Sequence, residues 1–134
     1  MEIKKLTDNV SVAGQIDISD ISAIKNAGYN IIINNRPDGE AIDQPTNKQI
    51  EKATREAGLD YIYIPVGRDG ISEEMIKQTN DLIKNNSSIF CYCRTGTRST
   101  MLWALSQKGK ISADDIISLA AKAGYDMAHL KDML

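Results

Sequence analysis

Two kinds of hydrophobic pattern alternate along the chain, and the first consists of short apolar runs. Ile31, Ile32 and Ile33 stand in a row, which is typical of a strand whose two faces are both covered. The run YIYIPV is short and rich in residues that favour strands. The predicted strands are Ile3–Leu6, Val10–Ala13, Tyr29–Asn35, Tyr61–Val66 and Ser88–Tyr92.

The second pattern is the helical spacing of apolar residues behind a capping residue and before a glycine. Thr46 and Gln49 form a capping-box pair, and the helix behind them ends at Gly58. Ser72 caps a helix whose apolar stripe runs to about Lys84. The remaining predicted helices are Ile18–Ala27, Ser99–Lys108 and Ser112–Ala123, with Asp126–Leu130 as a last turn.

Strands and helices therefore alternate along the sequence. This order predicts an α/β fold, a three-layer sandwich with a central, mostly parallel sheet flanked by helices. In such folds ligands bind beyond the carboxyl ends of the strands. The loops Asn34–Gly39, Gly67–Gly70 and Cys93–Arg98 each follow a predicted strand. We expect these three loops to converge on one site.

The composition of the 134 residues narrows the class of protein. Hydrophobic residues make up 42% and charged residues 25%, which is ordinary for a soluble globular protein, so we expect a single domain over residues 1–134. The net charge of −2 does not indicate a protein that binds nucleic acid or an anionic membrane. No apolar run reaches the roughly 18–20 residues that span a bilayer, and the first residues lack a signal-peptide pattern. With only two cysteines, the expected location is the reducing cytoplasm.

The segment from Phe90 to Ser99 carries the clearest chemistry. A buried strand ends at Cys93, a short loop with Gly96 at its centre follows, and a helix begins near Arg98. A loop of this form turns backbone N–H groups inward above a helix N-terminus, which creates a nest for an anion. The same partial positive charge favours a cysteine thiolate over the thiol. We therefore expect Cys93 to be a nucleophile and Arg98 to hold oxyanion charge.

The other cysteine and the single histidine have simpler interpretations. Cys91 is predicted to be a small hydrophobic residue of the core. A disulfide between Cys91 and Cys93 is disfavoured, because residues two apart on a strand are awkwardly placed for one. His129 has no partner pattern around it, which indicates a surface or packing role. The sequence contains no metal-ligand set, and we predict no cofactor.

Five segments, spread over nearly the whole chain, resemble one known family. They are Val12–Gln15, Ile33–Glu40, Tyr61–Val66, Cys93–Ser99 and Ala123–Asp126. In this order they resemble the phosphatase-like domain of beta-lactamase-hydrolase-like proteins, the DUF442 family, which is a relative of the dual-specificity protein phosphatases. The resemblance implies a fold like that of the dual-specificity phosphatases and a small anionic substrate.

The resemblance also implies roles for residues around the nucleophile. Asp69 stands in the loop where dual-specificity phosphatases carry their general acid, and it is equally a candidate for a solvated turn residue. Ser99 stands where the family's hydroxyl stabilises the departing thiolate, or it only caps the helix. Arg36 either reaches toward the anion or pins its own loop by pairing with Asp38 or Glu40.

The remaining loop residues complete the predicted anion site. Arg94 is expected to face outward, where it attracts anionic substrates or is a plain surface residue. Thr95, Gly96 and Thr97 mainly offer backbone N–H groups.

Two departures from the phosphatase signature leave the chemistry open. Tyr92 replaces the histidine that precedes the nucleophile in tyrosine and dual-specificity phosphatases. Only four residues separate Cys93 from Arg98 instead of five, which matches the six-residue active loop of the rhodanese sulfurtransferases. The other segments of the rhodanese pattern are missing.

The sequence therefore leaves three functions open. A cysteine-thiolate hydrolase that cleaves a phosphate ester through a cysteinyl-phosphate intermediate is favoured. A rhodanese-like sulfurtransferase, which takes a persulfide onto Cys93 from a sulfane-sulfur donor, is second. A binding module for phosphate-like anions without turnover is third. The sequence is also compatible with a homo-oligomer.

Overall fold

The fold is built around one five-stranded sheet, described here from a computed structural model that covers residues 1–85 and 87–134. The strands are β1 (Lys4–Thr7), β2 (Val10–Ala13), β3 (Ile31–Asn34), β4 (Asp60–Tyr63) and β5 (Ile89–Tyr92). They lie in the order β1-β2-β5-β3-β4, and only the pair of β1 and β2 is antiparallel. The parallel strands β2, β5, β3 and β4 therefore present their carboxyl ends at one edge of the sheet.

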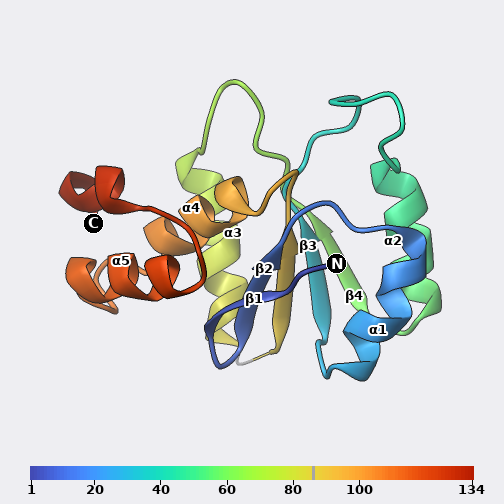
Figure 1. Cartoon of the computed structure of the whole chain (residues 1–134), viewed down its shortest axis with the longest axis horizontal. Coiled ribbons are helices and arrows are strands. Elements are labelled where there is room, and N and C mark those ends of the chain that lie inside the picture. Colours follow the sequence, from blue (N-terminus) through green and yellow to red (C-terminus); the bar gives the residue numbers. More distant parts are fainter. Residues whose placement is uncertain (86) are drawn as a thin grey trace.

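Helices cover both faces of this sheet, as Figure 1 shows. The helical elements are η1 (Ile18–Asp20), α1 (Ile21–Asn26), α2 (Asn47–Glu56), α3 (Glu73–Lys84), α4 (Thr97–Ser106), α5 (Ala113–Lys122) and η2 (Ala128–Met133). Helices α1 and α2 lie on one side, and α3, α4 and α5 lie on the other (Figure 1). The predicted three-layer α/β sandwich with a mostly parallel sheet is confirmed.

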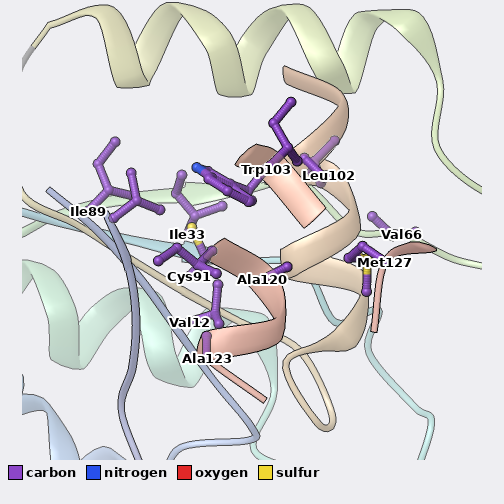
Figure 2. Close-up of a cluster of buried hydrophobic side chains, with 14 of the residues drawn as sticks. Val12, Ile33, Val66, Ile89, Cys91, Leu102, Trp103, Ala120, Ala123 and Met127 are labelled. Atoms are coloured by element: carbon purple, nitrogen blue, oxygen red, sulfur yellow. The ribbon is translucent and has the colours of Figure 1, made fainter. Parts of the chain in front are cut away.

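The central strands explain the run of three isoleucines. Because side chains alternate along a strand, Ile33 enters the core on the side of α3, α4 and α5, while Ile32 enters the core on the side of α1 and α2. Cys91 joins the first cluster, where Figure 2 shows it together with Ile33 and Trp103. Both faces of β3 are buried, so a continuous apolar run replaces the alternation of a half-exposed strand.

Several predicted boundaries are wrong in ways that have local causes. Strand β4 stops at Tyr63 rather than Val66, because its register with the chain after β3 is lost there: Ile64 and Val66, two residues apart, donate to the adjacent carbonyls of Asn34 and Asn35, each at 2.9 Å. The predicted helix Ile18–Ala27 is split into η1 and α1, since its first turn closes through a bond three residues apart, from the Asp20 N–H to the Asp17 carbonyl at 3.0 Å.

Two further corrections concern the elements nearest the C-terminus. Helix α4 begins at Thr97, two residues before the predicted start, and ends at Ser106. The last turn is a 3-10 helix over Ala128–Met133 instead of Asp126–Leu130. The Asp126 side chain accepts the Ala128 N–H at 3.0 Å, so Asp126 lies before the helix and the helix begins at Ala128. The earlier start of α4 brings the helix N-terminus directly to the loop that follows β5.

The two faces of β3 allow a direct test of the two core clusters. Ile32→Ala and Ile33→Ala each remove a fully buried side chain and leave a cavity, so each should lower the free energy of unfolding by about 2–5 kcal/mol. Ile42 is fully exposed and serves as the control, with a change within about 0.5 kcal/mol for Ile42→Ala. Denaturant unfolding measures all three. A loss at only one of the two β3 positions would contradict the sandwich.

Candidate active site

Three loops meet at the carboxyl edge of the sheet, as the sequence predicts. Arg98 lies in the first turn of α4 and links the other two loops to its own. Its Nη1 donates to the Val66 carbonyl at 2.9 Å, in the loop after β4. The same atom donates to Oε2 of Glu40 at 2.7 Å, in the loop after β3. The guanidinium group is thus the point of contact among the three strand ends.

Cys93 lies at the floor of the loop that joins β5 to α4. The residue is 1% exposed, and its Sγ accepts the Gly96 N–H at 3.1 Å. Helix α4 begins at Thr97, directly after Gly96, so the positive end of the helix dipole also points at the loop. The sulfur thus has one backbone donor and lies beside a helix N-terminus, which are two of the features expected for the predicted nest.

Gly96 is required at its position for two independent reasons. Its φ of +92° lies in the left-handed region, which disfavours side chains. A Cβ added there would overlap the Tyr125 hydroxyl and approach the Ala13 carbonyl oxygen to 3.3 Å. The loop is therefore closely covered by the segment after α5 and by the end of β2.

Tyr125 is a contributor to the site that sequence reasoning missed. Its hydroxyl donates to the Thr95 carbonyl at 3.0 Å and so fixes the outer half of the loop. Burial raises the pKa of Tyr125, and the nearby negative charge of Cys93 raises it further. Tyr125 lies in one of the segments that resemble the family, and that resemblance was the only signal available for it.

The loop is also anchored to the segment that follows β2. The Gln15 N–H donates to the Arg94 carbonyl at 3.2 Å, and the Cys93 N–H donates to the Ala13 carbonyl at 3.4 Å. Gly14 lies between these two contacts, and a Cβ on it would stand 2.9 Å from the Arg94 oxygen. The backbone of the loop is held from both sides, which limits how far its N–H groups can turn away from the sulfur.

Arg98 keeps part of its guanidinium group free. Among the described residues, three of its five N–H groups are engaged: two on Nη1, with Glu40 and Val66, and one on Nη2, with Glu40 at 2.9 Å. The other two, on Nε and Nη2, share one edge of the planar group. Such an edge suits two oxygens of an oxyanion. The hydrogen bond to Glu40 raises the pKa of Arg98, and the charge of Cys93 adds to the effect.

Glu40 joins two arginines to each other. Its Oε1 accepts from Nε of Arg36 at 3.0 Å as well as from Arg98, and these two guanidinium groups, Arg98 first, lower its pKa to about 2. Arg36 is 4% exposed, and its Nη1 donates to Oε1 of Gln15 at 3.0 Å. Of the two roles considered for Arg36, the structure shows the pinning one, with Glu40 rather than Asp38 as partner.

Ser99 makes a hydrogen bond away from the sulfur. Its hydroxyl donates to Oδ1 of Asn35 at 2.8 Å, and the Asn35 amide in turn donates to the Ile64 carbonyl at 2.9 Å. A hydroxyl has one proton, so in this arrangement Ser99 ties α4 to the loop after β3. Ser99 is the third residue of α4, and the N-cap is Gly96, so the predicted capping role is wrong.

The remaining predicted site residues lie at the rim. Asp69 is exposed, in a turn that the Gly70 N–H closes on the Gly67 carbonyl at 3.1 Å. Arg94 is also exposed, as expected. Thr95 and Thr97 are exposed and share a hydrogen bond of 3.1 Å between their hydroxyls. The general-acid and turn interpretations of Asp69 are both compatible with this position.

The side chains before the nucleophile belong to the core. Cys91 is buried, and burial raises its pKa to about 12, so it is a neutral thiol and the predicted core role is confirmed. Tyr92, which stands where tyrosine and dual-specificity phosphatases carry a histidine, packs on the opposite face with Ile32 and Phe90. Burial raises the pKa of Tyr92 as well. Neither side chain is arranged to exchange protons with a substrate.

Residues 1–85 and 87–134 contain no group of three or more His, Cys, Asp or Glu side chains placed to hold a metal ion. His129 is exposed on η2, in line with the expected surface role. None of the helices in this part of the chain has the length and apolar character needed to cross a membrane.

Comparison with known sequences assigns the family. The model of the phosphatase-like domain of beta-lactamase hydrolase-like proteins matches residues 2–110. The chain belongs to this family. It is 34% identical over 130 residues to a beta-lactamase hydrolase-like protein of Xylella fastidiosa strain Temecula1, and 33% identical to one of Agrobacterium fabrum strain C58. Each match covers 95% of this chain but only 30% of the relative. The chain thus spans under a third of the length of these relatives.

Several solved structures share the fold of this phosphatase-like domain. A candidate phosphatase from Neisseria meningitidis Z2491 has a TM-score of 0.85 and 30% identity, covering 98% of this chain and 95% of the other. A DUF442 protein from Shewanella putrefaciens CN-32 has a TM-score of 0.70 and 20% identity, covering 88% and 76%. Kinase associated phosphatase shares the fold at a TM-score of 0.70 and 15% identity, covering 98% and 89%. The expected relationship to dual-specificity phosphatases is confirmed for the fold.

The contact between Gly96 and Tyr125 generates a prediction about loop geometry. Gly96→Ala should slow the alkylation of Cys93 by iodoacetate at least about tenfold, because the loop must open to clear the Tyr125 hydroxyl and the donor to the sulfur moves. Gly109→Ala is the matched control, since Gly109 has a φ of +82° with open space around it. It should share the backbone strain of about 1–2 kcal/mol and leave alkylation unchanged. Equal rates in the two variants would contradict the prediction.

The low pKa of Glu40 predicts a pH-dependent contribution to stability. The usual value is 4.5 and the folded value is about 2, so the stabilisation is fully present above 4.5 and is lost as the pH falls toward 2. Wild type should therefore be more stable than Glu40→Gln at about pH 5, and the difference should shrink at about pH 3. Denaturant unfolding at both pH values measures it.

Glu56→Gln provides the control for this titration. Glu56 pairs with Lys52 at 3.9 Å on the surface of α2, where both side chains are exposed, so its removal should change little at either pH. A stability difference between wild type and Glu40→Gln that stays constant from about pH 5 to about pH 3 would show that the charge of Glu40 is not what holds the two arginines.

Proposed function

We propose that this domain is a cysteine-dependent hydrolase of the phosphatase type, which cleaves a phosphate ester through a cysteinyl-phosphate intermediate. The observation that carries the proposal is a sulfur held by a backbone donor at the point where three loops meet on one arginine. The Gly96 N–H binds Cys93 Sγ, and Arg98, five residues after Cys93, keeps one edge of its guanidinium group free while Glu40 and Val66 hold the rest. A phosphoryl group bound to that edge would have a thiolate below it.

The reaction would proceed in two displacements at phosphorus. The Cys93 thiolate forms the S–P bond while the bond from phosphorus to the ester oxygen breaks, and Asp69 gives its proton to the departing oxygen. Arg98 and the N–H groups of the loop hold the charge on the other oxygens. Water then forms a new P–O bond, passes its proton to Asp69, and breaks the S–P bond. Phosphate leaves and the thiolate is restored.

The position of Asp69 supports its part in this scheme. Its loop follows Val66, whose carbonyl accepts a hydrogen bond from Arg98, so the loop is held against the anion site. Asp69 is exposed at the tip of the turn, where a carboxyl group can meet the leaving group of a bound ester. Ser99, one turn behind the sulfur, would help by holding α4 against the loop after β3 through Asn35.

A second candidate, persulfide transfer, is favoured by the length of the loop. With four residues between Cys93 and Arg98, the ring of N–H groups is smaller than in the phosphatase signature, which suits a compact sulfane sulfur better than a tetrahedral phosphate. The thiolate would attack the sulfane sulfur of a persulfide donor, form an S–S bond on Cys93 and release the donor as a thiolate. A thiol acceptor would then remove that sulfur, and Asp69 would be dispensable.

Turnover of an aryl phosphate tests the hydrolase. Cys93→Ser should abolish turnover, and Asp69→Asn should lower kcat by roughly 10²–10⁴-fold through loss of the general acid. Asp81→Asn, which removes a surface carboxylate of α3 paired with Lys77 at 3.4 Å, should turn over like wild type. If wild type and all three variants hydrolysed the aryl phosphate no faster than the uncatalysed reaction, the phosphatase proposal would be wrong.

The same proteins distinguish the other candidates. After incubation with glutathione persulfide, intact-mass measurement of a sulfurtransferase should show one added sulfur in wild type and in Asp69→Asn, and none in Cys93→Ser. That adduct without phosphatase activity would replace the first proposal with the second. Binding of inorganic phosphate, with neither turnover nor adduct, would identify a binding module, detected as a rise in Tm.

A further inference from the structure

An apolar groove runs away from the anion site along helix α4. It encloses about 300 Å³, and its floor is the face of α4 that carries Arg98, Met101 and Leu105. Ile71, from the loop before α3, lines one part, and Leu130 and Met133, from η2, line another. Met133 is 53% exposed although its side chain is large and apolar. The volume lies at the lower end of the range for small-molecule sites, roughly 300–1,000 Å³.

The groove begins at the residue that would hold the anion. Arg98 lines it, and Val66, whose carbonyl accepts from Arg98, lines it as well. Gly67 and Gly70, which close the turn that carries Asp69, also contribute to the wall. The proposed leaving-group proton donor and the mouth of the groove therefore belong to the same turn. A group attached to the ester oxygen would lie between them.

The far end of the apolar stretch is marked by a change in polarity. Leu105 and Met133 also line a second hollow, which continues between α3 and α4 and carries Glu73, Lys77 and Lys108. Arg98 and Leu105 are seven residues apart on a helix that rises ~1.5 Å per residue, so the apolar floor is about 10 Å long. The apolar groove thus has Arg98 at one end, and at the other end it meets a hollow with charged side chains.

We propose that this groove binds the hydrocarbon part of the substrate, so that the domain prefers anionic esters whose alcohol is an alkyl chain or a similarly slender apolar group. The inference rests on the proposed anion site at Cys93 and Arg98. Burial of apolar surface in the groove adds binding energy that inorganic phosphate and small polar esters cannot gain. Met101 and Met133 supply flexible side chains that adapt to such a chain.

Protection of Cys93 from iodoacetate by alkylphosphonates tests this inference. The probes are methylphosphonate and octylphosphonate, which carry the same head group, and the readout is the concentration that halves the alkylation rate. For wild type, octylphosphonate should protect at a concentration at least about tenfold lower than methylphosphonate. Met101→Gln and Met133→Gln should remove most of this preference and leave methylphosphonate protection unchanged.

A matched control and three outcomes decide the result. Ile18→Gln alters a side chain that is 51% exposed and lies outside the groove, and it should keep the wild-type preference. Equal protection by the two probes in wild type would overturn the groove inference while leaving the anion site intact. A preference that survives in both methionine variants would also overturn it, since the chain would be held elsewhere. If neither probe protects, the proposed anion site fails and the groove inference fails with it.

Discussion

The hydrogen bond from the Gly96 N–H to the Cys93 sulfur is the interaction on which the rest of the site depends. It forms only because the chain turns from β5 into α4 within a few residues, and that turn needs a left-handed residue without a side chain under the Tyr125 hydroxyl. The N-terminus of α4, the carbonyl of Ala13 and the segment after β2 then hold the loop in place. The Cys93 sulfur is thereby fixed at the carboxyl edge of the sheet.

Charge balance around this sulfur follows from the loop after β3. Arg36 and Arg98 share the single carboxylate of Glu40, so the cluster retains one positive charge next to Cys93. That excess positive charge suits an oxyanion bound beside the sulfur. The carboxylate also fixes which edge of Arg98 stays open, because it occupies the edge formed by Nη1 and Nη2. Glu40 therefore determines both the net charge beside Cys93 and which edge of Arg98 is left open to an oxyanion.

Patterns in the sequence predicted the sheet, the convergence of three loops and the nest around Cys93, because each depends on local spacing or on the rule that parallel strands end at one edge. The contacts that complete the site were not predictable: Tyr125 was missed, and the partner of Ser99 was not foreseen. Tyr125 and Ser99 act through contacts 30 and 64 positions away, with Thr95 and Asn35. Such pairs leave no periodicity in a single sequence. Boundaries differed where contacts between distant segments decide them, such as the end of β4, where Ile64 and Val66 donate to the adjacent carbonyls of Asn34 and Asn35.

Family membership and fold place this domain among phosphatase-like proteins, while its short loop and buried Tyr92 set it apart from the usual signature. Phosphoryl and sulfur transfer both begin from the same ionised sulfur. The most direct test is therefore the rate of iodoacetate alkylation of Cys93 in the native protein from about pH 5 to about pH 9, with the adduct located by mass spectrometry. At about pH 7 the native sulfur should react faster than the same cysteine in the unfolded chain, because the loop donors surround it. A native rate no faster than that of the unfolded chain would contradict this role of the loop.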